Sequence, residues 1–220
     1  MRPVLEALRL RDVDVYLTGS RAHGRAADGS DWDLIALAPD DEGARLGLHP
    51  LERRDVGVDL IGPVLRAWRE EQELSIWAWE LGHGKLLHEA WGGGERYRAE
   101  LARRFEAERE PLAVRWWARF RLQRNVARSV LAKGDPLAIL LTVPLAAHAA
   151  VRAALLWAGR PYPPDKWLAA ETPEPLREPV RALVDQSRNA ADRLDALEEL
   201  RRLVEEPVPV ERLGDWYRLV

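Results

Sequence analysis

The chain has 220 residues, of which 47% are hydrophobic and 31% charged, a composition typical of a globular protein with one or two domains. It contains no cysteine, which excludes disulfide bonds and thiolate-bound metals and leaves oxygen atoms or histidine as metal ligands. Residues 1–92 carry 11 Lys/Arg and 17 Asp/Glu, whereas residues 93–220 carry 22 and 19. Because we find no signal-peptide pattern and expect no apolar run of roughly 20 residues, we predict a cytoplasmic protein without a membrane partner.

The first 92 residues alternate between short apolar runs and turns. Their pattern predicts helices at 3–10 and 63–81, and strands at 13–18, 32–38, 56–61 and 85–88. Three consecutive glycines follow at 92–94 and mark the expected domain boundary. We therefore expect one domain over residues 1–92 and a second over residues 93–220.

The second part of the chain is dominated by helical periodicity. The expected helices span residues 97–110, 112–133, 136–159, 176–187 and 191–205. Residues 161–164 read as a turn, and the tail from residue 207 is irregular. The fold class that follows is α+β, with a small mixed sheet in the first domain and an α-helical bundle in the second.

A Gly-Ser pair stands directly after the first predicted strand. Gly19 lets the backbone turn sharply and approach a ligand closely, and Ser20 offers a hydroxyl and an N–H group in what we expect to be the first turn of a helix. Arg21 and Arg25 could add positive charge to the same place. On its own this pattern is more typical of an ordinary helix cap.

Three aspartates form the candidate metal site. Asp31 and Asp33 are two residues apart at the start of a strand, so both carboxylates are expected on one face, with Trp32 and Leu34 directed to the core. Asp59 is the only charge in the apolar strand VGVDLIG, where an unpaired carboxylate is costly unless it binds a metal or a counter-charge. If the two strands are neighbours, the three carboxylates converge.

Electrostatics decides what such a convergence requires. Two unit charges about 4 Å apart repel by about 4 kcal/mol at an effective dielectric constant of about 20, so the carboxylates need protons, arginines or cations. Oxygen ligands beside a phosphate-binding turn favour Mg²⁺. A bare Asp-x-Asp pattern is by itself more typical of a solvated strand start.

The motifs in combination resemble those of the nucleotidyltransferase superfamily, whose fold is related to that of DNA polymerase beta. The resemblance is carried by GSRAHG at 19–24, SDWDL at 30–34 and VDL at 58–60. It implies a mixed sheet backed by helices. It also implies transfer of a nucleoside monophosphate from an NTP, with ATP the expected donor, to an acceptor hydroxyl with release of pyrophosphate.

The resemblance also implies roles for individual residues. Gly19 and Ser20 would hold the β- and γ-phosphates, Asp31 and Asp33 would ligate two Mg²⁺ ions, and Asp59 would ligate the metal that activates the acceptor oxygen. AKGDP at 132–136 and RPYPPDKWL at 160–168 are similar to the helical domain of small bacterial enzymes, including aminoglycoside and lincosamide nucleotidyltransferases. That looser similarity adds Lys166 as a candidate phosphate contact.

The acceptor separates the remaining hypotheses. A small molecule with a hydroxyl group is the leading expectation, and the helical domain would cover the acceptor side. The alternatives are an adenylylating antitoxin-like protein that modifies a protein partner, and a nucleotide-binding module without catalysis. Nucleic acid is not the expected partner, because no large basic surface is evident in the sequence.

Overall fold

The computed structural model describes residues 6, 8, 12–41, 55–206 and 208. The chain divides into two compact units, Met1–Phe105 and Glu106–Val220, each with its own architecture. The first unit contains a mixed sheet and the second is helical, so the predicted α+β fold class is confirmed. The tail from residue 207 and almost all of the helix expected at 3–10 lie outside the described residues.

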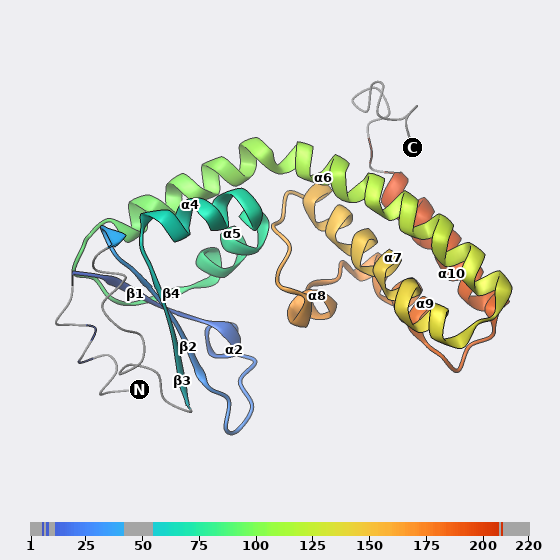
Figure 1. The fold of residues 1–220 in the computed structure, drawn as a ribbon, viewed down its shortest axis with the longest axis horizontal. Helices are drawn as coiled ribbons and strands as arrows, with labels where there is room; N and C mark the ends of the chain where they lie inside the picture. Colours follow the sequence, from blue (N-terminus) through green and yellow to red (C-terminus); the bar gives the residue numbers. More distant parts are fainter. Residues whose placement is uncertain (1–5, 7, 9–11, 42–54, 207, 209–220) are drawn as a thin grey trace. The chain divides into compact units, whose positions relative to one another are not determined.

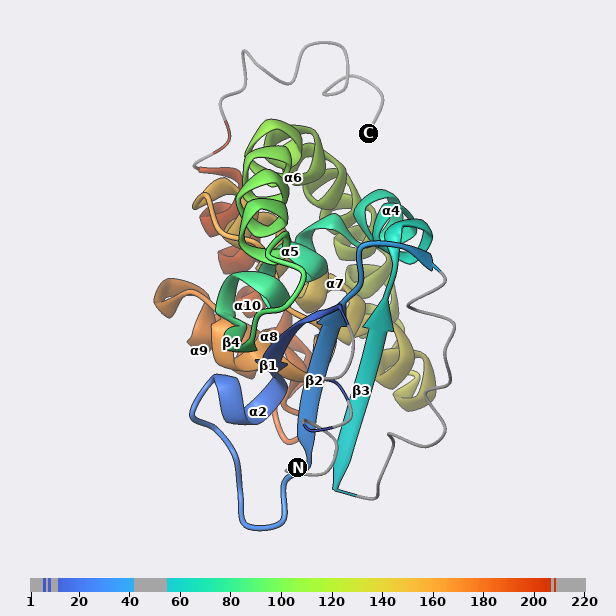
Figure 2. The same ribbon diagram turned by 90° about the vertical axis from the view of Figure 1, so that its left-hand side faces the viewer.

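The sheet of the first unit has four strands in the order β3-β2-β1-β4 (Figures 1 and 2). They are β1 (Asp14–Thr18), β2 (Trp32–Leu37), β3 (Val56–Ile61) and β4 (Lys85–His88), close to the predicted bounds. β1 is antiparallel to β2 and to β4, whereas β2 and β3 are parallel. The two long strands that carry the candidate aspartates are therefore neighbours, as convergence of the carboxylates requires.

Alternation along the strands separates two faces of this sheet. One face belongs to a hydrophobic core that contains Val15, Leu17, Leu34, Ala36, Val58 and Leu60, with Trp32 packed against it. This confirms the prediction that Trp32 and Leu34 point to a core. Asp33 and Asp59 have the opposite parity on their strands, so their side chains belong to the other face.

Among the described residues of the first unit, helices lie between successive strands of the sheet. α2 (Gly19–Ala22) follows β1 directly, so Ser20 lies in a first helical turn as expected. α4 (Pro63–Gln72) and α5 (Leu74–His83) replace the single helix predicted at 63–81. The break falls at Glu73, whose φ of −133° and ψ of 29° are not helical. This break lets α5 take its own direction and contact β1.

The longest helix, α6 (Gly94–Lys133), has 40 residues and contains Pro111. The prediction of two helices separated at this proline is wrong. An interior proline removes one backbone hydrogen bond and often kinks a helix, but it need not end one. The compact units divide within α6, after Phe105, whereas the glycines predicted a boundary after residue 92. The roles assigned to the two parts of the chain stay predictions.

The second unit consists of the rest of α6 together with α7 (Pro136–Trp157), α8 (Asp165–Glu171), α9 (Glu174–Val184) and α10 (Ala190–Glu205). α7 contacts α8, α9 and α10. Asp135 caps α7 by accepting hydrogen bonds from the N–H groups of Leu137 and Ala138. The short helix α8 was not predicted, because its sequence DKWLAAE follows the proline-rich turn without a clear apolar period.

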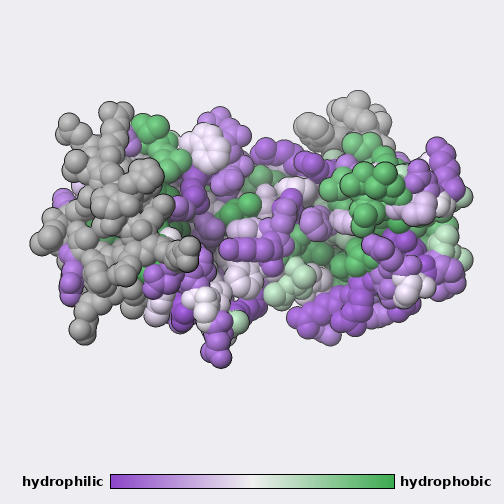
Figure 3. All heavy atoms as spheres, turned by 60° about the horizontal axis from the view of Figure 1, so that its bottom comes forward, coloured by the Kyte–Doolittle hydropathy of each residue, from purple (hydrophilic) through white to green (hydrophobic). Residues whose placement is uncertain are grey.

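Among the described residues, α7 is long and apolar enough to cross a membrane by length and composition. On that criterion the expectation of no such run is wrong. Half of its most apolar stretch is nevertheless buried within the protein, and the core helix of a soluble protein passes the same test, so the indication of a membrane is weak. The exposed part contributes to the apolar surface of the helical unit in Figure 3; its large exposed side chains are Leu137, Leu140, Leu141 and Leu145.

Candidate active site

The turn after β1 brings the backbone against the carboxylate of Asp33. Gly19 has a φ of 62°, in the left-handed region that glycine adopts most easily. A Cβ atom at this position would lie 1.8 Å from Oδ2 of Asp33, far inside any allowed contact. Glycine is therefore required at position 19 for two reasons: the left-handed backbone conformation and the close approach of the turn to Asp33.

A second glycine lies on the other side of Asp33. In the register of the sheet, Asp33 is paired with Thr18 of β1 and with Gly57 of β3. The Thr18 hydroxyl donates a hydrogen bond to the Asp33 carbonyl oxygen at 3.3 Å, and a Cβ at Gly57 would lie 3.9 Å from Asp33 Oδ1. The Gly19 backbone therefore packs against Oδ2 of Asp33, whereas Gly57 places no side chain against Oδ1, an arrangement that suits an oxygen-ligated cation at Oδ1.

Asp31 and Asp59 share the face of Asp33. Asp31 is exposed and stands one residue before β2, so strand alternation puts it on the same side as Asp33. Asp59 pairs in register with Ile35, two residues further along β2. Its side chain is 61% exposed and accepts a hydrogen bond of 3.1 Å from Nη2 of Arg69.

Arg69 joins Asp59 to Glu80. Its Nη1 donates to Oε2 of Glu80 at 3.1 Å, and its guanidinium lies 4.9 Å from the ring centre of Trp77. Within the described residues, no three acidic or histidine side chains come together as a metal-binding group. Asp33 and Asp59 thus share a face of the sheet, as predicted, but Asp59 has an arginine as its counter-ion. The assignment of the three aspartates as metal ligands stays a prediction.

The two arginines predicted to contact phosphate lie on the same loop. The Arg21 guanidinium donates to the carbonyl oxygens of Ser30 and Asp31 and lies 4.3 Å from the ring centre of Trp32. Arg21 thereby fixes the turn that precedes β2. Arg25 is exposed. Its backbone N–H donates a hydrogen bond of 2.8 Å to the Ser20 carbonyl oxygen and closes the loop after α2. Phosphate contacts of both side chains stay predictions.

A stack of three rings attaches this loop to α5, an attachment that the sequence does not predict. The His23 ring lies 4.2 Å from the ring of Trp79, nearly parallel to it, and 4.8 Å from the ring of His83. Trp79 is buried, and Nδ1 of His83 lies 2.8 Å from its carbonyl oxygen. His23 lies far from Trp79 and His83 in the sequence, so no local sequence pattern could reveal this contact.

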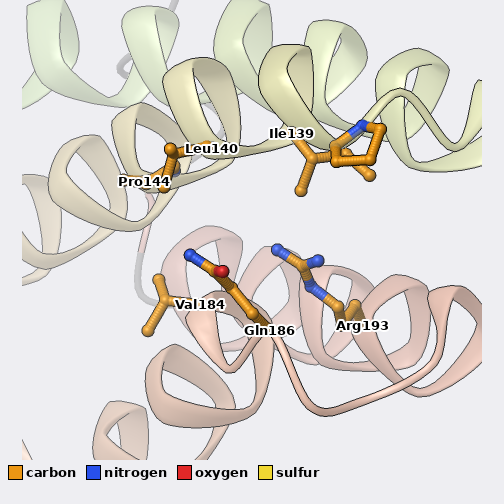
Figure 4. A pocket seen from close by; sticks show the side chains of 7 residues that line it. Ile139, Leu140, Pro144, Val184, Gln186 and Arg193 are labelled. Carbon is orange, nitrogen blue, oxygen red and sulfur yellow. The ribbon is translucent and has the colours of Figure 1, made fainter.

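Lys166 belongs to the second unit. It lies in α8, with its ammonium group 5.7 Å from the ring centre of Trp167, and its predicted contact with phosphate stays untested. A cavity of about 250 Å³ in the same unit lies between α7 and the α9–α10 region (Figure 4). Its walls are largely apolar, and Gln186 and Arg193 supply the polar groups. Arg193 donates through Nε to the Leu183 carbonyl oxygen at 2.8 Å, so part of its hydrogen-bonding capacity is used inside the fold.

Replacing Gly19 by alanine should reduce stability more than any other glycine change in this loop. We expect Gly19→Ala to lower the free energy of unfolding by about 3 kcal/mol, because the left-handed backbone and the collision with Asp33 both oppose a Cβ atom. The measurement is urea-induced unfolding. Gly24→Ala is the matched control, since Gly24 has a φ of 66° and a Cβ atom added there would meet no other atom within 4 Å. Equal losses in the two variants would contradict a close contact at Gly19.

Comparisons with known proteins agree with this geometry. The family model described as "Nucleotidyltransferase domain" matches residues 1–105. Among solved structures, the chain is similar to a nucleotidyltransferase-like protein from Exiguobacterium sibiricum 255-15, with a TM-score of 0.54 and 17% sequence identity. That likeness covers 97% of this chain and 75% of the other, and at this identity it shows the fold alone. A search of curated proteins found no significant match. Residues 1–105 therefore form a nucleotidyltransferase domain.

Proposed function

We propose that the protein is a metal-dependent enzyme that transfers a nucleoside monophosphate from ATP to a hydroxyl group of a small-molecule acceptor. The observation that carries the proposal is the position of Asp33, with glycines on both sides of its carboxylate and the Gly19–Ser20 turn directly against it. A purely structural aspartate at a strand start needs neither glycine. The family match of residues 1–105 supports nucleotidyl transfer as the general reaction.

The proposal gives each group of residues a task. Gly19 and Ser20 would hold the terminal phosphates, and Asp31 and Asp33 would hold Mg²⁺ together with Asp59. Bound there, the cation would supply charge neutralisation for the triphosphate and the leaving pyrophosphate. In the reaction the acceptor oxygen attacks the α-phosphorus, the bond to the bridging oxygen breaks, and pyrophosphate departs. The proton of the acceptor hydroxyl passes to Asp59 or to solvent.

Arg69 is the residue whose position most affects this assignment. Because it binds both Asp59 and Glu80, it determines where the Asp59 carboxylate points. Glu80, whose side chain is 24% exposed, binds the same arginine, so Arg69 bridges two carboxylates. We assign Asp59 the contact with the acceptor oxygen and Arg69 the orientation of Asp59.

Transfer can be tested directly with ATP labelled at either end. With Mg²⁺ and a panel of hydroxyl-bearing small molecules, label in the α-phosphate should appear in the modified acceptor, whereas label in the γ-phosphate should appear in pyrophosphate. Chelation of the metal should stop both. Appearance of γ-label in the acceptor would indicate phosphoryl rather than nucleotidyl transfer and would overturn the proposal.

The same assay separates the alternatives. Labelling of a protein partner in place of any small molecule would favour the antitoxin-like function. ATP binding without transfer to either class of acceptor would favour a nucleotide-binding module. The nucleotide-binding module is worth testing because Asp59, the proposed metal ligand, is paired with Arg69.

A further inference from the structure

A buried arginine without an acidic partner lies outside the candidate active site. Arg66 of α4 is only 9% exposed. Its Nη1 atom is enclosed and has no hydrogen-bond partner, and in the part of the chain that the structure describes no carboxylate forms an ion pair with it. Burying a guanidinium without a counter-charge is unfavourable, so this position calls for a compensating interaction.

Two aromatic rings provide part of that compensation. The Arg66 guanidinium lies 4.9 Å from the ring centre of Trp91 and 5.0 Å from that of Tyr97. The Trp91 ring is held close to the backbone, since a Cβ at Gly93 would lie 2.4 Å from its ring atoms. Ring faces attract a cation but accept hydrogen bonds poorly, so Nη1 of Arg66 still lacks a good acceptor.

Arg66 lines a cavity of about 280 Å³, together with Trp91, Tyr97 and a second arginine, Arg96. Arg96 is exposed and has no ion pair with the described residues. The cavity thus offers two guanidinium groups and the flanking Trp91 ring. A cavity of this kind fits a small molecule better than it fits an extended surface of a partner protein.

The acidic residues of the cavity offset only part of the charge of these arginines. Oε1 of Glu70 accepts a hydrogen bond of 2.7 Å from the Tyr97 hydroxyl, and its other oxygen pairs with Arg104. Burial, followed by the hydrogen bond to Glu70, raises the pKa of Tyr97 above its ordinary value, so the hydroxyl stays protonated and keeps donating. Glu100 is an exposed carboxylate at the cavity wall. With Glu70 balanced by Arg104, the lining keeps an excess of one positive charge.

We propose that this cavity is a binding site for the carboxylate or phosphate group of a small molecule. Arg66 is its principal donor, Arg96 is the second donor, and the Trp91 ring lies beside the bound group. The site is separate from the candidate active site: Asp33 pairs with Thr18 at one end of the sheet, whereas α4 begins shortly after Ile61 at the other end (Figure 2). The proposal is independent of the reaction catalysed near Asp33.

Hydrogen exchange of the full-length protein tests the site, with inorganic phosphate and acetate as the two probes. Phosphate, acetate or both should slow exchange in residues 91–97, and the more effective anion identifies the bound group. Arg66→Met should weaken that effect at least about tenfold, because it removes charge-assisted hydrogen bonds. Arg115→Met, which removes an exposed positive charge from α6, should leave it unchanged.

The readout at residues 91–97 distinguishes this site from anion binding at the loop of residues 19–24. If Arg66→Met does not fold, Arg96→Met replaces it, since Arg96 is exposed and its loss leaves no buried group unpaired. Protection of residues 91–97 by neither anion, or equal protection in the wild-type protein and in the arginine variant, would overturn the proposal.

Discussion

Asp33→Asn is expected to lower the rate of nucleotidyl transfer by at least about a thousandfold, the loss that several kcal/mol of transition-state stabilisation implies. The reason is geometric as well as electrostatic. The carboxylate lies between Gly19 and Gly57, and an amide of the same size keeps the packing but removes the negative charge. The rate is measured with α-labelled ATP, and circular dichroism checks that the fold is retained.

Asp28→Asn is the control for this experiment. Asp28 lies in an exposed turn of the same loop and loses the same charge on substitution. Its variant should transfer at nearly the wild-type rate. Activity that survives Asp33→Asn would refute the role of Asp33. An equal loss in both variants would also refute it and would leave the loop's overall charge as the explanation.

Asp14→Ala is expected to reduce the free energy of unfolding of the first unit by about 3 kcal/mol or more, because buried donors would lose their acceptor. Asp14 is 1% exposed. Its Oδ1 accepts hydrogen bonds from the N–H groups of Ala90 and Gly92 at 2.9 and 3.1 Å, and its Oδ2 accepts one from Gly94 at 2.7 Å. Asp14 thereby binds β1 to the segment that leads into α6.

Urea unfolding and hydrogen exchange together test this prediction. The N–H groups of residues 90–94 should exchange faster in Asp14→Ala, and Asp14→Asn should be intermediate because its amide retains one acceptor oxygen. Asp12→Ala, an exposed position two residues earlier, should change neither quantity. Unaltered exchange at residues 90–94 in Asp14→Ala would show that the carboxylate is not the essential acceptor.

The contrast between Asp14 and Asp59 shows where a sequence pattern stops being informative. A single carboxylate in an apolar strand is expected to need a partner, and this expectation singled out Asp59. The Asp59 side chain is 61% exposed, whereas Asp14, in an equally apolar strand, is the buried one. Alternation alone cannot tell these cases apart, because exposure of a strand position depends on which helix covers it.

The strands and the turn at Gly19 were predictable for a physical reason. Short apolar runs bounded by glycine have few alternatives, and a period of two fixes which residues share a face. Asp33 was therefore predicted on the face opposite Trp32 without any knowledge of the neighbouring strands. The orientation of Asp59 depends on Arg69 from α4, a long-range contact that no period in the sequence reveals.

Helix ends were less predictable than strands. Pro111 lies within α6, whereas Glu73, an ordinary helix former, stands at the break between α4 and α5. Local propensity alone predicts neither of these two outcomes. The contact of Arg66 with the rings of Trp91 and Tyr97 was not predicted, because these residues lie in separate segments of the chain.

The hydrogen bonds of Asp14 have a consequence for anyone dividing this protein. A fragment that ends at residue 92 would lack Gly94, and with it one of the N–H groups that donate hydrogen bonds to the buried Asp14 carboxylate. It would also remove Leu101 and Phe105, which are buried in the same unit. An excised catalytic fragment must therefore extend through the first turns of α6, at least to Phe105, in order to remain soluble and correctly folded.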